Sequence, residues 1–231
     1  MEVDECVPDE LFADSAVNGS VDKLEGIPVR EDRTSLKALL DEVRACRACE
    51  PHLPLGARPI VRAAKTSRIL IVGQAPSASV HASGIPWDDA SGERLRYWMG
   101  IDSATFHDES LLAIIPMGLC YPGRGGGGDN PPRRECAPQW QQSLLQHLPD
   151  IRLTLLIGQY AQRHYLRGRC KSSLTETVMA WRDYAPDIIP LPHPSPRNTA
   201  WFQRHPWFEN EVLPALRERV KSQTGEASRQ G

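Results

Sequence analysis

The chain has 231 residues, which is enough to bury a hydrophobic core, and its 40% hydrophobic and 24% charged residues are typical of a soluble globular protein. It contains no run of about 18 apolar residues, and its acidic N-terminus lacks a basic region followed by an apolar stretch. We therefore expect a cytoplasmic protein with neither a membrane span nor a secretory signal.

Charge is divided unevenly along the chain. Residues 1–33 hold ten acidic and three basic residues, a net charge of −7, whereas the remainder holds 24 basic and 19 acidic residues, a net charge of +5. This predicts an acidic, disordered tail over 1–33, a mildly basic domain over 34–221 and a second disordered tail over 222–231. A mildly basic surface is compatible with a nucleic-acid partner without requiring one.

The predicted elements begin with an amphipathic helix over 34–46, which has apolar residues at positions 36, 39, 40 and 43. Apolar segments that predict strands then alternate with helical patterns, with strands at 67–73, 111–117, 152–158 and 187–192 and helices at 91–100, 134–148, 159–166 and 207–221. This alternation predicts an α/β fold with a central four-stranded parallel sheet covered by helices on both faces. Ligands in such folds bind beyond the carboxyl ends of the strands.

A glycine-rich segment at 123–129 follows the second predicted strand. A phosphate-binding loop would need Gly-Lys-Ser/Thr at the start of a helix, and that sequence is absent. We therefore interpret the segment as only a flexible loop.

Four of the six cysteines form the pattern C-x2-C followed by C-x15-C, at Cys46, Cys49, Cys120 and Cys136. Without a secretory signal a disulfide framework is not expected. Four thiolates suit zinc or an iron–sulfur cluster, although Cys120 and Cys136 can also be ordinary buried apolar residues. The other two, at positions 6 and 170, fall in the acidic tail and in a basic loop, and we exclude them.

Three further segments accompany this cysteine pattern: GQAPS at 73–77, GIPWDDASGERL at 84–95 and HPSP at 193–196. Together, over roughly residues 36–221, they resemble the uracil-DNA glycosylase superfamily, most closely the iron–sulfur branch usually called family 4. GQAPS is similar to the GEAPG loop of that branch, the second segment is similar to its GRPFVGxAGxLL, and HPSP is the second motif of the superfamily. The continuation over 197–199 looks more like family 5.

The resemblance implies a three-layer α/β/α sandwich and a DNA glycosylase of base-excision repair, which removes uracil or another deaminated base from DNA. A single histidine in a loop is more often structural than catalytic. Together with the three companion motifs, however, the resemblance makes His193 the expected donor to the oxyanion that develops on the base. Trp87 stands where the family has its stacking Phe, and would stack on the flipped base. Asn198, Ser195 and Arg197 would contact DNA phosphates.

The resemblance also implies that the loop Gly73, Gln74, Ala75 and Pro76 meets the base carbonyl through its backbone N–H groups. The four cysteines would hold a structural 4Fe-4S cluster, with zinc as the alternative. The expected partner is DNA that contains uracil or a related damaged base, bound by a monomer, with no membrane.

Three departures bear on activity. Gln74 stands where family 4 has a Glu, Ala75 where family 1 has an Asp, and Pro116 where family 4 has the Asn that reads the uracil edge, so recognition by an Asn at that position is excluded. Asp88 and Asp89 are the nearest carboxylates to the expected pocket and are candidates for orienting water, unless they only cap the following turn.

These departures leave two other hypotheses open. The first is a protein of the same fold that binds modified nucleic acid or a nucleobase-like ligand and has lost hydrolysis. The second is a zinc-stabilised α/β protein with no role on nucleic acid.

Overall fold

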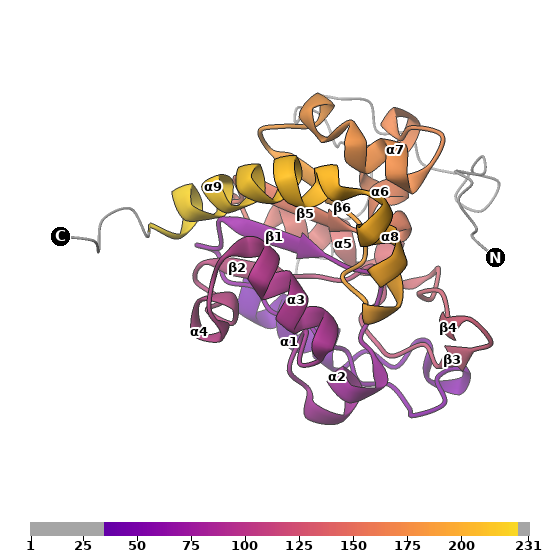
Figure 1. Ribbon diagram of the computed structural model, residues 1–231. Helices are drawn as coiled ribbons and strands as arrows, with labels where there is room; N and C mark the ends of the chain where they lie inside the picture. The colour runs from indigo at the N-terminus through magenta and orange to yellow at the C-terminus, as the bar shows by residue number, and fades with distance from the viewer. Residues whose placement is uncertain (1–34, 226–231) are drawn as a thin grey trace.

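The computed structural model describes residues 35–225, so the predicted tail at 1–33 and Cys6 lie outside the described residues. Its centre is a four-stranded parallel sheet in the order β2-β1-β5-β6, built from β1 (Ile69–Val72), β2 (Leu112–Ile114), β5 (Leu153–Ile157) and β6 (Ile188–Leu191). Helices cover both faces of the sheet (Figure 1), which confirms the predicted three-layer α/β/α sandwich. Pro190 is tolerated in β6 because β6 is an edge strand.

Alternate side chains of β1 point to opposite faces of the sheet, as strand geometry requires. Ile69 and Ile71 pack into one buried cluster, and Leu70 and Val72 pack into the other. The long helices on the first face are α3 (Ala90–Met99) and α9 (Leu213–Thr224), and those on the second are α1 (Leu36–Arg44), α5 (Cys136–Gln146) and α6 (Gln159–Leu166). Burial on both faces explains why the strands appear in the sequence as continuous apolar segments.

Shorter helices connect these elements and were not predicted. The α-helical ones are α2 (Ala78–Ser83), α4 (Ser103–Phe106), α7 (Leu174–Met179) and α8 (Thr199–Arg204), and the 3-10 turns are η1 (Glu50–His52), η2 (Arg167–Arg169), η3 (Trp181–Asp183) and η4 (Pro196–Asn198). Each has at most six residues, too short for a helical period to be evident in the sequence.

The last helix differs from its predicted bounds of 207–221. Its first helical residues are 206 and 207, a π-helical segment, η5 (Phe208–Val212), follows, and it continues as α9 to Thr224, so residues 222–224 are helical rather than part of a tail. Pro214 lies in the first turn of α9 and has no N–H for a regular helical hydrogen bond, which accounts for the wider turn before it.

The glycine-rich segment is the clearest correction to the sequence-based prediction. It folds into an antiparallel hairpin of two very short strands, β3 (Arg124–Gly125) and β4 (Gly128–Asp129). The backbone N–H of Asn130 donates to the carbonyl of Gly123 at 2.8 Å and closes the hairpin. Gly123 has φ of +92° and Gly128 has φ of +147°, conformations that side chains disfavour, so glycine is required for this shape.

The order of the strands locates the site. The chain passes from β1 to β2 on one side and then to β5 on the other, so the crossover direction changes at the carboxyl end of β1. The loops that follow β1, β2 and β6 converge at this edge. No helix within residues 35–225 is long and apolar enough to cross a membrane.

Candidate active site

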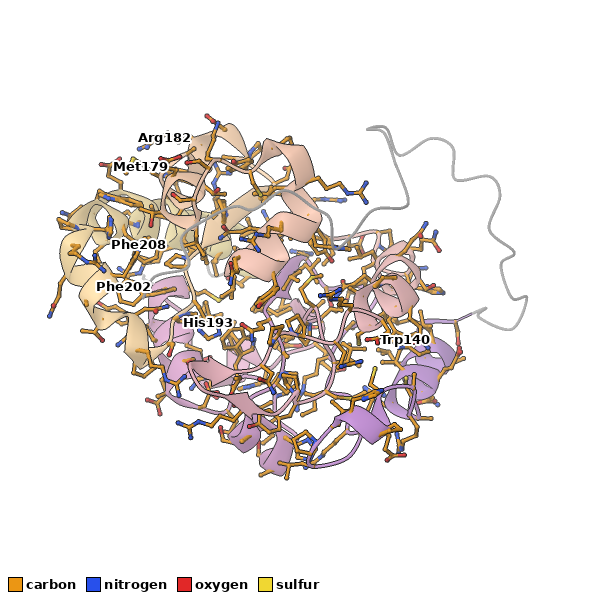
Figure 2. The ribbon with its side chains drawn as sticks, turned by 90° about the vertical axis from the view of Figure 1, so that its right-hand side faces the viewer. Trp140, Met179, Arg182, His193, Phe202 and Phe208 are labelled. Carbon is orange, nitrogen blue, oxygen red and sulfur yellow. The ribbon has the colours of Figure 1, made fainter. Side chains whose placement is uncertain are left out.

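A cavity of about 560 Å³ opens at the carboxyl edge of the sheet, a size typical of small-molecule sites. Ten of the predicted site residues line it: Gly73, Gln74, Ala75, Pro76, Trp87, Asp89, His193, Ser195, Arg197 and Asn198. Asp88 is exposed and does not line the cavity. In Figure 2, His193 lies near the centre of the view, where this edge faces the reader.

His193 is held as a neutral hydrogen-bond donor. Its Nδ1 accepts from the backbone N–H of Ser195 at 3.2 Å, so in the neutral ring the proton lies on Nε2. Burial lowers the pKa of His193 to about 4, although the neighbouring Asp89 carboxylate raises it. Nε2 has no protein partner among the residues that the structure describes, and it is therefore available to a ligand in the cavity.

The His193 loop is pinned from two directions. Asn198 Nδ2 donates to the carbonyl of His193 at 2.8 Å, and Arg94 Nη1 donates to the carbonyl of Ser195 at 3.0 Å. The amide of Asn198 is thus engaged with the loop itself. Arg197 is exposed, and its Nη1 donates to the carbonyl of Gly127 at 3.4 Å, so its guanidinium lies at the rim of the cavity.

Trp87 forms an aromatic wall beside the histidine. The centroids of the Trp87 and His193 rings are 5.8 Å apart with an interplanar angle of 35°. Trp87 has φ of +58°, a conformation that costs a bulky residue about 1–3 kcal/mol and that persists only where the surroundings enforce it.

Two glycines and an arginine enforce that conformation. A Cβ on Gly92 would lie 1.8 Å from the carbonyl oxygen of Trp87, and a Cβ on Gly73 would lie 2.9 Å from Cζ2 of its indole. Arg96 Nη1 donates to the same carbonyl oxygen at 3.2 Å. The conformation of Trp87 therefore requires glycine at positions 73 and 92, where any Cβ would collide with it, as well as the hydrogen bond from Arg96.

Asp89 both caps a helix and lines the cavity. Its Oδ1 accepts from the backbone N–H of Gly92 at 2.9 Å, the N-cap interaction of α3, and its Oδ2 accepts from the Ser77 hydroxyl at 2.8 Å. Asp89 therefore caps the following helix, as one interpretation expected, and it also lies at the cavity.

Gln74 and Pro116 also line the cavity. Gln74 Nε2 donates to the carbonyl of Asn130 at 2.9 Å, so its amide is engaged with the glycine-rich hairpin. Pro116 offers neither an amide nor an N–H.

The sequence analysis missed Asp129, which comes from β4 and lines the same cavity. Partial burial raises the pKa of its carboxyl, which Arg197 and Arg124 oppose and Asp89 reinforces. The only sequence signal was its position, directly after a run of glycines beyond the second strand.

The four predicted metal ligands lie together elsewhere. Cys46, Cys49, Cys120 and Cys136 line one small cavity of about 20 Å³, near Trp140, which Figure 2 shows apart from His193. Within residues 35–225, no three His, Cys, Asp or Glu side chains converge closely enough to hold a single metal ion.

The cysteine cavity is a costly environment for free thiolates. Burial, reinforced by the neighbouring sulfurs, raises the pKa of Cys120 to about 11 and that of Cys136 to about 12. The backbone N–H of Leu119 donates to Cys136 Sγ at 3.3 Å. A soft cationic centre would remove this cost, so the chemistry of the donor set fits a thiolate-bound metal group.

A family model described as the Uracil DNA glycosylase superfamily matches residues 61–217. This match covers more than half of the chain, so the chain belongs to that superfamily, and membership supports a DNA glycosylase-like function. The matched segment includes Cys120 and Cys136 and excludes Cys46 and Cys49.

Proposed function

We propose that this member of the superfamily is a DNA glycosylase that hydrolyses the N-glycosidic bond of uracil, or of another deaminated base, in DNA. The observation that carries the proposal is the pairing of a neutral His193, with its Nε2–H available, and the ring of Trp87 on one cavity. A base inside a duplex must be flipped out to reach such a cavity.

Each side chain then has a definite task. The Trp87 ring stacks on the flipped base, and His193 Nε2–H donates to the oxygen on which negative charge develops as the bond breaks. Because its pKa is about 4, His193 stays neutral at pH 7 and meets the anion as a donor without first releasing a proton. Exposed Arg197 at the rim contacts the DNA phosphates, where contacts position the strand without reading sequence.

We also propose that Cys46, Cys49, Cys120 and Cys136 hold a 4Fe-4S cluster with a structural role. Four thiols from three segments line one cavity, and burial raises the pKa of Cys120 and Cys136, a cost that a bound metal group would relieve. Four cysteine thiolates are the usual ligands of a 4Fe-4S cluster. When bound, it would cross-link the end of α1 to the start of α5.

The test is release of free base from uracil-containing oligonucleotides, single- and double-stranded, by anaerobically purified protein, with alkali to reveal abasic sites. Loss of one oxyanion donor costs about 10²–10³-fold in rate, so His193→Ala should be slowed by that factor. His52→Ala is the matched control, because His52 is exposed and does not line the cavity.

A second candidate function is supported by Pro116 and Gln74, which line the cavity without offering a free amide or a carboxylate. In this reading the cavity binds a nucleobase but does not cleave its bond. Tight binding of uracil-containing DNA with no abasic product, on uracil and on other deaminated bases, would favour this function over the first.

A further inference from the structure

Glycosidic hydrolysis needs a group that orients the attacking water and accepts its proton. Position 74 cannot supply that group, because Gln74 is an amide and its Nε2 is engaged with the carbonyl of Asn130. Asp89 lines the cavity, but both its oxygens already accept hydrogen bonds, one from the α3 cap and one from Ser77. A carboxylate on the cavity wall that accepts no hydrogen bond from residues 35–225 is freer to hold a water.

Asp129 is such a carboxylate. It lies in β4 and lines the cavity that His193 and Trp87 share. Among residues 35–225, nothing donates a hydrogen bond to its side chain, so its oxygens are available to a water. The charged groups that face it are Arg124 on β3, Arg197 beyond β6 and Asp89 at the start of α3.

Two residues of the site itself fix the hairpin on either side of Asp129. Gln74 Nε2 donates to the carbonyl of the following residue, Asn130, at 2.9 Å. Arg197 Nη1 donates to the carbonyl of Gly127 at 3.4 Å. The Asn130 side chain in turn donates to the carbonyl of Pro122 at 3.3 Å, which closes the base of the hairpin.

This arrangement needs a hydrogen-bond donor at position 74, which the amide of Gln74 supplies. A glutamate there would have no proton to donate at neutral pH, and its carboxylate would lie against the carbonyl oxygen of Asn130. The amide of Gln74 therefore holds the hairpin that carries Asp129.

We propose that Asp129 is a catalytic residue that orients the hydrolytic water and takes its proton, and that Gln74 is the residue that positions it. The inference rests on the proposed glycosylase function. The C1′–N1 bond breaks and its electron pair passes to the base, whose oxygen accepts a hydrogen bond from the Nε2–H of His193, which keeps its proton. The water oxygen bonds to C1′, its proton passes to Asp129 and then to solvent, and the released base takes up a proton from solvent.

The raised pKa of the Asp129 carboxyl is consistent with this role, because a base with a pKa closer to the working pH accepts a proton more readily. The exposed position of Asp129 at the mouth of the cavity leaves a path for water and for the proton to reach solvent.

The experiment measures single-turnover release of uracil together with binding of an abasic-site oligonucleotide. Loss of a general base slows the chemical step by about 10²–10⁴-fold, so Asp129→Asn should show that loss with unchanged binding. Added formate should restore part of the rate of Asp129→Ala, which a merely structural role would not allow. The control is Asp150→Asn, an exposed aspartate outside the cavity.

A second variant addresses position 74. Gln74→Glu should lower the rate by at least about tenfold, because the hairpin loses its anchor and a like charge approaches Asp129. A faster Gln74→Glu enzyme would show that the acid belongs at 74 and would overturn the inference, as would full activity of Asp129→Asn. If the wild type releases no base at all, the proposed glycosylase function is wrong, and the role of Asp129 that rests on it is wrong too. If the wild type releases base and Asp129→Asn does so equally fast, only the role of Asp129 is wrong.

Discussion

Gly73 is where the indole of Trp87 comes closest to the backbone, and Gly73→Ala tests whether that contact sets the position of the ring. The new Cβ would lie 2.9 Å from Cζ2 of Trp87. Carbon atoms in contact prefer about 3.5–4.0 Å, so the ring must move by roughly 0.6–1 Å. The backbone of Gly73 cannot easily yield, because its carbonyl accepts from the N–H of Met117 at 2.9 Å.

We expect two consequences of different size. Overpacking should lower the free energy of unfolding by about 1–3 kcal/mol, measured by thermal or urea unfolding. Displacement of a stacking surface by up to ~1 Å should slow uracil release by up to about 100-fold. Gly126→Ala is the control, because no heavy atom lies within 4 Å of its Cβ position. Wild-type cleavage and stability in Gly73→Ala would refute the view that this glycine positions the tryptophan.

Three further perturbations test other parts of the structure. The pKa of His193 is near 6.5 in the unfolded chain and about 4 in the folded chain, so the free energy of unfolding should fall as pH drops from 6.5 to 4, by at most about 3 kcal/mol. In urea unfolding measured across this pH range, His193→Gln should show a shallower fall than the wild type. Asp89→Ala removes the α3 cap and should lower the free energy of unfolding by about 0.5–2 kcal/mol, whereas an unchanged melting temperature would mean that the cap contributes nothing. Cys120→Ser should lose iron, visible absorbance and thermal stability together, and full iron content in this variant would exclude Cys120 as a ligand.

The sheet could be predicted because the apolar side chains of each strand lie next to one another in the sequence. Ile69, Leu70, Ile71 and Val72 are all buried, and a short apolar segment between helical patterns leaves few other interpretations. The same pattern places the residues after each strand at one edge, so His193 and Gln74 could be assigned to a common site before any contact was known.

The conformation of the Trp87 loop could not be predicted, because it depends on close approaches between residues that are distant in sequence. Nothing local to the tryptophan indicates a positive φ, which depends on Gly92 lying against its carbonyl oxygen. The glycine run after β2 was misinterpreted for a related reason. A run of glycines indicates only that the backbone can adopt many conformations. The hairpin is held by a hydrogen bond from Gln74 to Asn130, which is 56 positions away in the sequence.

The hairpin also connects the two sites of the molecule. It lies between Cys120 and Cys136, and the backbone N–H of Gly118, just before this segment, donates to the carbonyl of Gln74 at 2.9 Å. A cluster held by those cysteines would fix both ends of the loop, while Gln74 fixes its middle from the cavity side. The proposed cluster and Gln74 would then serve the same end, because both would limit the positions that the carboxylate of Asp129 can take.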